Sequence, residues 1–391
     1  MKAIINGKIV TPTEIITDKF LIIKDDIIFD IADSINENDF EILIDAHGRY
    51  VTPGFIDTHS DKIEQFIQPR PTSKMDFELA LKECERELLL QGITTMYHSL
   101  SLFKDEFFGS SPIRTKENVL KLADLINSIH ERNHLIHHRF HLRIEIDNLK
   151  AYDIIKSMIA QKKVHQISFM DHTPGQGQYR NLEIYKKTIS SYKGKEIENL
   201  GFDGVLNYHQ NKDMLSFEQL KELTDFAHQN GIAVASHDDD TAEKLNINKE
   251  IGVDVSEFPI TIETAKEAKR LGFLTVAGAP NILLGGSHSG NMSASEAICE
   301  GCVDILCSDY YPPAMLHSVF IMNKKHNIPI CEMVKKVSLN PARAMNIDKN
   351  YGSIEIGKKA DILIIDILDE YPIITHVLVD GKLISRIEYR R

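Results

Sequence analysis

The sequence lacks any long hydrophobic run, since no stretch reaches the roughly 18 apolar residues that a membrane-spanning helix needs. The first residues, MKAIINGKIVTPTE, also lack the apolar core and cleavage site of a secretory signal peptide. These two absences argue against an integral membrane protein and against secretion. We therefore expect a cytoplasmic protein that makes no contact with membranes.

Cysteine is scarce, because the 391 residues include only five. An odd number in a long chain argues against a disulfide framework, so we expect reduced thiols. Cys299 and Cys302 have the Cys-x-x-Cys spacing of redox and zinc sites, but no second such pair and no histidine pair accompanies them. We interpret them as structural residues at the end of a helix.

Basic residues are outnumbered, with 45 Lys and Arg against 57 Asp and Glu, which gives a net charge of -12. This charge disfavours binding to nucleic acids and anionic membranes, because their phosphates would repel the protein. An anionic substrate would need a local basic patch.

The two ends of the chain are rich in short β-strand patterns. Residues 1–50 contain AIINGKIV, FLIIKDDIIFDIA and EILIDAHGRYV, and residues 349–391 contain SIEIGKKADILIID and ITHVLVDGKLISRIEY. Asn6-Gly7 predicts a hairpin turn between the first two strands. Because the ends match in type and flank a different middle, we expect them to pair into one small β-sandwich.

The middle of the chain, residues 51–348, alternates short apolar runs with amphipathic stretches, which is typical of repeated βα units. Helices are expected in FELALKECERELLLQ, SFEQLKELTDFAHQN and ETAKEAKRLG. The eight strand candidates are VTPGFIDTH, GITTMYHSL, FHLRIEID, VHQISFMDH, GIAVASHDD, VDVSEFP, FLTVAGAP and VDILCSDYY. Eight strands close a barrel. The predicted fold is an α/β protein: a (β/α)8 TIM-type barrel with a small β-sandwich built from both chain ends.

Polar residues gather at the carboxyl ends of these apolar runs. His59 and Asp61 would point to one face if they lay on one strand. Active sites of such barrels form at this edge from residues of several strands. Asp238 to Asp240 taken alone are typical of a helix cap or a loop hydrogen bond. Six polar strand ends together predict a metal-centred site: His59 and Asp61, Glu145, Asp171 and His172, His237 and Asp238, Glu257, and Asp309.

Longer motifs carry a resemblance to a known family. NGKIV, LIDAHGRYVTPGFIDTH, SLNPARAMNI, GSIEIGKKADILIID and VLVDGK resemble the amidohydrolase superfamily of metal-dependent hydrolases. MDHTPGQGQ and GAPN followed by GGSHSGN resemble one narrower family, phosphonate-degrading hydrolases that release diphosphate from a ribosyl triphosphate. The resemblance brackets almost the whole chain. It implies the barrel, the β-sandwich and a divalent metal.

The chain departs from the wider superfamily at three strand ends. Most members have His-x-His on the first strand, where this chain has His59-Ser60-Asp61. Many also have a carbamylated Lys on strand four and a His on strand six, where this chain has Asp171 and Glu257. These departures fit the narrower family and argue against a typical ring-opening or deaminating enzyme. They leave the number of metal ions open.

The expected metal chemistry follows from these residue types. A divalent ion held by imidazole and carboxylate lowers the pKa of bound water towards about 7 and polarises a phosphoryl oxygen. Zinc suits the histidines, whereas manganese or magnesium suits the carboxylates and a triphosphate, so one or two ions of these metals stay open. Asp309 is also the candidate general base, because the superfamily keeps a carboxylate there that touches both metal and water. The expected ligands are His59, Asp61, His237 and Asp309, with Asp171 or Glu145 bridging two ions.

Further residues are candidates for substrate binding and proton transfer. His172 and His288 would stabilise charge or protonate the leaving group, or are ordinary loop histidines. Arg70 and Arg180 would supply positive charge, or are surface ion-pair partners. The glycine-rich segment after strand seven suits phosphate, because barrels often bind phosphate there and successive N–H groups form an anion-binding nest. Its predicted contacts are Gly285, Gly286, Ser287 and Asn291.

The sequence thus predicts a metal-dependent hydrolase of a phosphoanhydride in phosphonate catabolism, with a small ribosyl triphosphate as substrate. The alternative within the superfamily is a cyclic amide hydrolase or deaminase. A catalytically inactive scaffold is the alternative outside enzymes. We expect no nucleic acid or membrane partner, and a homo-oligomer stays open.

Overall fold

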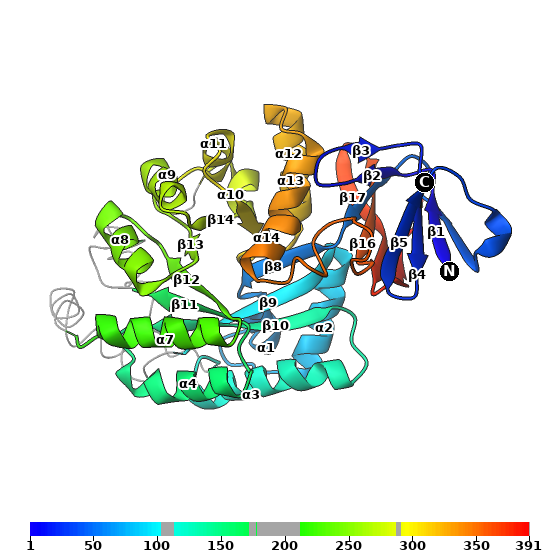
Figure 1. Cartoon of the computed structure of the whole chain (residues 1–391). Coiled ribbons are helices and arrows are strands. Elements are labelled where there is room, and N and C mark those ends of the chain that lie inside the picture. The colour runs from blue at the N-terminus through cyan, green and yellow to red at the C-terminus, as the bar shows by residue number, and fades with distance from the viewer. Residues whose placement is uncertain (103–112, 172–176, 178–211, 287–290, 391) are drawn as a thin grey trace.

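A computed structural model of the chain describes residues 1–102, 113–171, 177, 212–286 and 291–390 (Figure 1). Figure 1 shows a large barrel with helices around it and, beside it, a smaller β-rich part that contains both the first and the last strands. Among the described helices, none is long and apolar enough to cross a membrane. The predicted fold class, a (β/α)8 barrel with a β-sandwich made from both ends, is confirmed.

Eight parallel strands form the barrel, and each overlaps one of the strands predicted from the sequence. The last strand returns to the first through backbone hydrogen bonds. Asp309 N–H donates to His59 O over 3.0 Å, and Asp61 N–H donates to Asp309 O over 3.1 Å. In chain order, which is also their order in the sheet, the strands are β8 (Phe55–Ser60), β9 (Ile93–Leu102), β10 (His137–Glu145), β11 (Gln166–Met170), β12 (Ala233–His237), β13 (Val255–Glu257), β14 (Leu274–Gly278) and β15 (Ile305–Cys307).

Side chains alternate along each barrel strand between the interior and the surrounding helices. On β9, Tyr97 packs inside the barrel with Ile56 and Val255, whereas Met96 and Leu100 belong to the core between barrel and helices. Large side chains therefore fill the barrel, and its binding site lies at the strand ends.

Helices cover the outside of the barrel where the sequence predicts them. FELALKECERELLLQ forms α2 (Phe77–Leu90), which begins after Asp76 because that carboxylate accepts hydrogen bonds from the first-turn N–H groups. SFEQLKELTDFAHQN forms α7 (Phe217–Gln229), which starts with a capping box between Ser216 and Gln219. The other described helices are α1 (Lys62–Ile67), α3 (Lys116–Ser128), α4 (Tyr152–Ala160), α8 (Ala242–Ile251), α9 (Ile262–Arg270), α10 (Ala279–Leu284), α11 (Ala294–Cys299), α12 (Pro313–His326), α13 (Ile330–Val337) and α14 (Leu339–Ala344), with short 3-10 turns at Glu37–Asp39, Ile129–Glu131 and Leu149–Ala151.

Both ends of the chain build the β-sandwich. Ile4 and Leu21 of one sheet pack with Ile362 and Leu378 of the other, so apolar burial joins the two ends. The four-stranded sheet has the order β5 (Ile27–Ala32), β4 (Phe20–Lys24), β1 (Lys2–Ile5), β6 (Ile42–Asp45). The six-stranded sheet has the order β18 (Lys382–Arg386), β17 (Tyr371–Val379), β16 (Ile362–Leu368), β7 (Tyr50–Pro53), β2 (Lys8–Val10), β3 (Ile15–Ile16).

The hairpin predicted at Asn6-Gly7 is wrong. β1 pairs with β4 and β6 in one sheet, whereas β2 pairs with β3 and β7 in the other. Asn6 does adopt the left-handed φ of a tight turn, 55°, but this turn carries the chain from one sheet to the other. Ile4 and Ile9 both lie in the core between the sheets, so burial there outweighs the local preference for a hairpin.

The chain enters the barrel between Pro53 and Phe55. β7 ends at Pro53 and pairs with β16 and β2 in the sandwich, and β8 begins at Phe55. The sequence predicted the barrel from residue 51 because the apolar run appears continuous through the turn. Gly54 makes the passage possible, since an added Cβ would lie 2.1 Å from Thr94 Oγ1.

The cysteines carry free thiols, as expected. Cys299 ends α11, and the buried Cys302 donates a hydrogen bond from Sγ to Ala297 O over 3.2 Å. This contact agrees with a structural role for Cys302, whereas Cys299 is exposed.

A buried histidine pair lies between the barrel wall and α2. His98 Nε2 is 2.9 Å from His138 Nδ1, and His138 Nε2 is 3.1 Å from Glu85 Oε2. With both rings neutral, His138 donates to the carboxylate from Nε2 and accepts from His98 at Nδ1. Burial lowers the pKa of His98 well below its ordinary value, and burial also lowers the pKa of His138. Burial likewise lowers the pKa of His165 to about 3.

The lowered pKa values of these histidines predict that the protein loses stability in acid. An unfolded chain takes up their protons near pH 6.5, whereas the folded chain takes them up only at lower pH, so the free energy of unfolding falls below about pH 6.5. Urea unfolding at pH 7.5 and 5.5, with chelator throughout, measures this fall. His98→Asn keeps a donor towards His138 but cannot titrate, so it should reduce the pH dependence. The same dependence in this variant would contradict the assignment.

Candidate metal centre and active site

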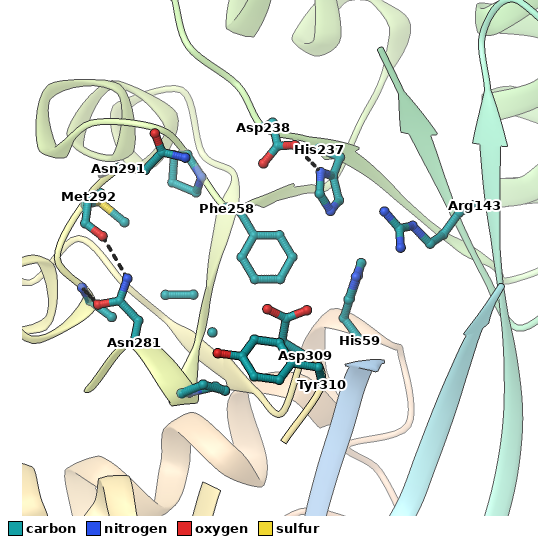
Figure 2. A pocket seen from close by; sticks show the side chains of 15 residues that line it. His59, Arg143, His237, Asp238, Phe258, Asn281, Asn291, Met292, Asp309 and Tyr310 are labelled. Carbon is teal, nitrogen blue, oxygen red and sulfur yellow. Dashed lines mark hydrogen bonds and ion pairs between the residues drawn. The ribbon is translucent and has the colours of Figure 1, made fainter. Parts of the chain in front are cut away.

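A pocket lies at the carboxyl ends of the barrel strands (Figure 2). His59 comes from β8, His237 ends β12, and Asp309 follows β15. Figure 2 shows these three side chains around one space, together with Arg143 from β10 and Phe258, which follows β13. The strand ends of the barrel therefore converge on one site, at the edge that the sequence predicted.

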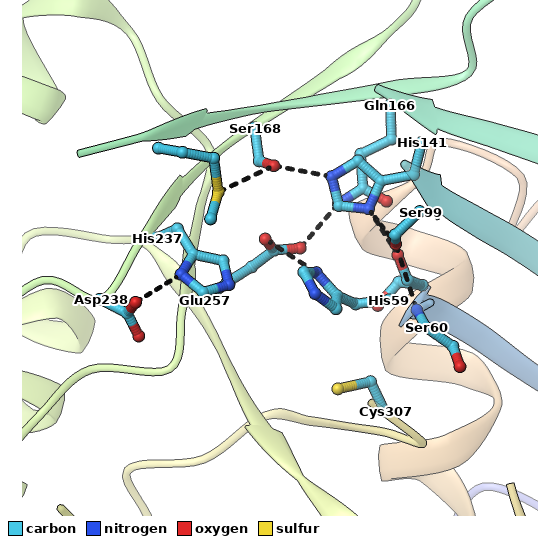
Figure 3. Close-up of polar contacts among 12 residues, drawn as sticks. His59, Ser60, Ser99, His141, Gln166, Ser168, His237, Asp238, Glu257 and Cys307 are labelled. Carbon is cyan, nitrogen blue, oxygen red and sulfur yellow. Dashed lines mark hydrogen bonds and ion pairs between the residues drawn. The ribbon is translucent and has the colours of Figure 1, made fainter. Parts of the chain in front are cut away.

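The centre of the pocket is a buried group of His59, His237 and Glu257 (Figure 3). One ligand atom from each lies within 4.8 Å of the others. Glu257 ends β13 and pairs in register with His237 of β12, which sets the two side chains next to each other. His59 Nδ1 and Glu257 Oε2 are 3.1 Å apart, yet neither atom makes a hydrogen bond.

This geometry fits a divalent metal. Buried polar atoms normally have hydrogen-bond partners, so two that face each other without one indicate a shared ligand. Ligand atoms of a tetrahedral zinc, with bonds of about 2.1 Å, lie roughly 3.4 Å apart. Burial first, and then the charge of Arg143, lower the pKa of His59 well below its ordinary value. The imidazole is therefore neutral, the form that binds a metal.

Hydrogen bonds from the neighbouring strands β10 and β11 hold the metal-binding group in place. Gln166 Nε2 donates to Glu257 Oε1 over 3.0 Å, which leaves Oε2 facing His59. His141 lies 2.9 Å from Ser168 Oγ through Nε2 and 3.1 Å from the carbonyl of Thr58 through Nδ1. Figure 3 shows Gln166, His141 and Ser168 beside the metal-binding group, at the top of the view. Such supporting contacts orient metal ligands.

The buried Asp57 supports the same strand. Its Oδ1 accepts hydrogen bonds from Ser308 N–H over 3.1 Å and from His59 N–H over 3.3 Å. Burial raises the pKa of Asp57 to about 7. The residue joins β8 to the segment after β15, and so fixes His59 relative to Asp309.

Three pocket residues that follow strands have left-handed backbones. Asp238, Phe258 and Asp309 have φ values of 54°, 55° and 57°. This conformation costs on the order of 1 kcal/mol for a residue with a side chain, and such strain gathers at functional sites. Asp238 Oδ2 lies 2.8 Å from His237 Nδ1. The backbone strain thus places side chains directly beside the metal-binding group.

Asp239 has the structural role that the sequence favoured for the Asp238 to Asp240 run. It is fully buried, and its carboxylate accepts hydrogen bonds from Ser236 Oγ over 2.5 Å, Ser256 Oγ over 2.5 Å and Asn248 Nδ2 over 2.8 Å. These contacts tie β12, β13 and α8 together. Asp238, in contrast, lines the pocket.

The structure places the predicted ligands in two groups. His59, His237 and Asp309 line the pocket, whereas the side chains of Asp61, Glu145 and Asp171 are not part of its lining. β8 ends at Ser60, and Asp61 has φ -93° and ψ 14° as the residue before α1, so the strand alternation stops before it. Glu145 ends β10 and Asp171 follows β11, at the predicted edge.

Only some of the predicted substrate-binding residues line the pocket. Asn291 lines the pocket. Its neighbour Met292 also lines the pocket and accepts a hydrogen bond at its carbonyl from Asn281 Nδ2 over 3.0 Å. Gly285 ends α10 with a φ of 74°, and Gly286 follows it. Arg70 is exposed in a turn and is not part of the pocket lining. Four predicted residues lie outside the described part of the chain: His172, Arg180, Ser287 and His288.

Sequence reasoning did not assign Glu257 as a ligand and did not identify Arg143. Both residues could have been recognised from their positions on the predicted strands. Arg143 lies two residues before Glu145 and two after His141, so strand alternation places it on the interior face of β10. Glu257 ends a predicted strand where many superfamily members have a ligand.

Comparison with known proteins identifies the family. The chain is 31% identical over 347 residues to the alpha-D-ribose 1-methylphosphonate 5-triphosphate diphosphatase of Escherichia coli, covering 87% of this chain and 89% of that one. Residues 208–384 also match the model of the amidohydrolase family. The chain belongs to the amidohydrolase family. It is therefore a hydrolase by family, with the barrel and strand-end site of that family.

Other similar proteins share less of the sequence. The imidazolonepropionase of Picrophilus torridus is 24% identical over 404 residues, covering 92% of this chain and 88% of that one. A solved Xaa-Pro dipeptidase with bound methionine has a TM-score of 0.67 at 17% identity, covering 98% of this chain and 99% of that one. A D-hydantoinase has a TM-score of 0.65 at 16% identity, covering 98% and 95%. These structures share the fold.

Proposed function

We propose that this amidohydrolase is a metal-dependent diphosphatase that converts α-D-ribose 1-methylphosphonate 5-triphosphate to the 5-phosphate and diphosphate, in phosphonate catabolism. The observation that carries the proposal is the 31% identity to a diphosphatase of that name over most of both chains. The pocket supports it, because Arg143 lies beside the metal-binding group and gives an acidic protein a local positive charge for phosphate.

The residues have separate roles in the proposed reaction. His59, His237 and Glu257 would hold a divalent metal, and such an ion supplies positive charge and activates water for attack on phosphorus. Asp309 accepts the proton of the attacking water. The bond between the first phosphate and the diphosphate breaks, and the electron pair leaves with the diphosphate. Arg143 and Asn291 contact phosphate oxygens, where negative charge increases in the transition state.

Phosphorus NMR tests the reaction directly. The metal-loaded protein is incubated with the ribosyl triphosphate, and every phosphorus product is identified. Diphosphate should appear without free phosphate, and the corresponding 5-phosphate compound should be inert. Early free phosphate together with a ribosyl diphosphate would indicate a stepwise phosphatase. Hydrolysis of a cyclic amide without phosphorus release would favour the alternative, which rests on the imidazolonepropionase relative.

Replacing Arg143 by glutamine tests the phosphate contact. Loss of one preorganised charge donor costs about 100- to 1,000-fold in kcat, so the variant should lose kcat and not merely raise KM. Arg132→Gln is the matched control, because Arg132 pairs with Glu78 on the surface. Arg70→Gln in the same assay tests the arginine that the sequence predicted. Full kcat in Arg143→Gln would remove Arg143 from the mechanism.

A further inference from the structure

A second group of metal-binding residue types lies where the barrel meets the β-sandwich. His137 is the first residue of β10, at the amino end of the strand and away from the pocket. Asp361 precedes β16, and Asp380 follows β17. One ligand atom from each residue lies within 4.8 Å of the other two. Since Asp361 and Asp380 are distant from His137 in the sequence, only the folded chain forms this group.

Buried polar atoms without hydrogen bonds point into the group. His137 Nε2 lies 3.2 Å from Asp361 Oδ2 and 3.8 Å from Asp380 Oδ2. Neither His137 Nε2 nor Asp361 Oδ2 makes a hydrogen bond, and both residues are only 7% exposed. The two separations fall on either side of the roughly 3.4 Å expected between ligands of one tetrahedral zinc. The atoms are therefore arranged around a common point.

The surrounding charges favour a cation. Asp380 N–H donates to Asp361 Oδ1 over 2.8 Å, which fixes that carboxylate and leaves its Oδ2 towards His137. Lys359 Nζ is 3.5 Å from Asp380 Oδ1 and also pairs with Asp26. Lys359 is thus shared between two carboxylates, Asp26 and Asp380, so the group keeps negative charge beside the His137 ring.

We propose that His137, Asp361 and Asp380 bind a divalent cation of the zinc class, separate from the catalytic metal, which holds the β-sandwich against the amino-terminal face of the barrel. One imidazole nitrogen and two carboxylates are ligands that zinc accepts. The side chain of Asp380 is 35% exposed, so water completes the coordination. Residues on this face of a barrel serve stability, and the cation therefore acts on unfolding and not on turnover.

Zinc content of the full-length protein tests the site. Wild type, His137→Asn and Asp380→Asn are dialysed against zinc and analysed for bound metal per chain. Asp380→Asn is the conservative variant, because asparagine tolerates the left-handed φ of 45° at this turn. Each variant should hold one ion fewer than wild type and keep its turnover. Asp366→Asn is the matched control from β16, the strand that follows Asp361, since Asp366 already pairs with Arg49.

A melting experiment separates this site from the catalytic one. In a His237→Ala background, zinc at about 100 times its Kd should still raise the melting temperature by about 4 °C. Adding Asp380→Asn should abolish that rise. Equal zinc content in wild type and both variants, or the same loss in Asp366→Asn, would overturn the proposal. Neither measurement depends on the substrate, so failure of the proposed function leaves this test valid.

Discussion

A Glu257→Gln variant is expected to lose bound metal and at least about 100-fold of the turnover on a ribosyl triphosphate. Glutamine can keep the hydrogen bond from Gln166, but it has no negative charge to offer a cation. Loss of a residue that only orients a ligand already costs about 10- to 100-fold, so loss of a ligand costs more. Elemental analysis and phosphorus NMR on the same preparation measure both effects.

Three comparisons make the Glu257 result specific. His237→Ala should behave like Glu257→Gln, since both remove a member of the same group. Glu263→Gln should behave like wild type, because Glu263 lies on the first turn of α9. Chelation of wild type should abolish turnover, and divalent ions should restore it. Normal metal content in Glu257→Gln would remove Glu257 from the ligand set, and unchanged turnover after extensive chelation would contradict a metal mechanism.

An Asp309→Asn variant is expected to lose about 100- to 10,000-fold of kcat, the usual effect of removing a general base. Asparagine has nearly the same shape, so the backbone bonds to His59 and Asp61 should persist and keep the barrel closed. Turnover is measured at saturating metal, because Asp309 is also an expected ligand. The bound metal is measured in parallel.

The pH profile separates the two roles of Asp309. In wild type, kcat should rise with pH as the carboxyl group loses its proton, whereas the variant should lack this dependence. A variant that regains full turnover once metal is bound would show that Asp309 acts as a ligand and not as a base. Asp309→Glu, which keeps a carboxylate, should retain more activity than Asp309→Asn.

Local patterns were sufficient to predict much of this fold. The barrel strands are short apolar runs, six of the predicted ones with polar residues at their carboxyl ends, and α2 and α7 begin at capping residues that are visible in the sequence. Backbone pairing and side-chain alternation act over a few residues, so they leave a periodic signal. The same reasoning did not predict the course of the chain at two turns. Asn6-Gly7 joins two sheets, and the run around Gly54 crosses from sandwich to barrel.

The candidate site was also predicted only in part from the sequence. The sequence by itself determined which edge of the barrel holds the polar residues, and it identified His59, His237, Asp309 and Asn291, which the structure places around one pocket. It also carried the motifs that resemble the family. These features depend on residue type and on position along a strand.

Only the tertiary structure decided which side chains meet. Glu257 stands beside His59 because β13 pairs in register with β12 and the barrel closes onto β8, whereas Asp61 is not part of the pocket lining, because β8 already ends at Ser60. His137 meets Asp361 and Asp380 for the same reason, through contacts between distant strands. Strand register and barrel closure are set by the burial of many apolar side chains across the whole fold. A pattern of a few residues does not report this total burial, so it cannot predict which distant side chains meet.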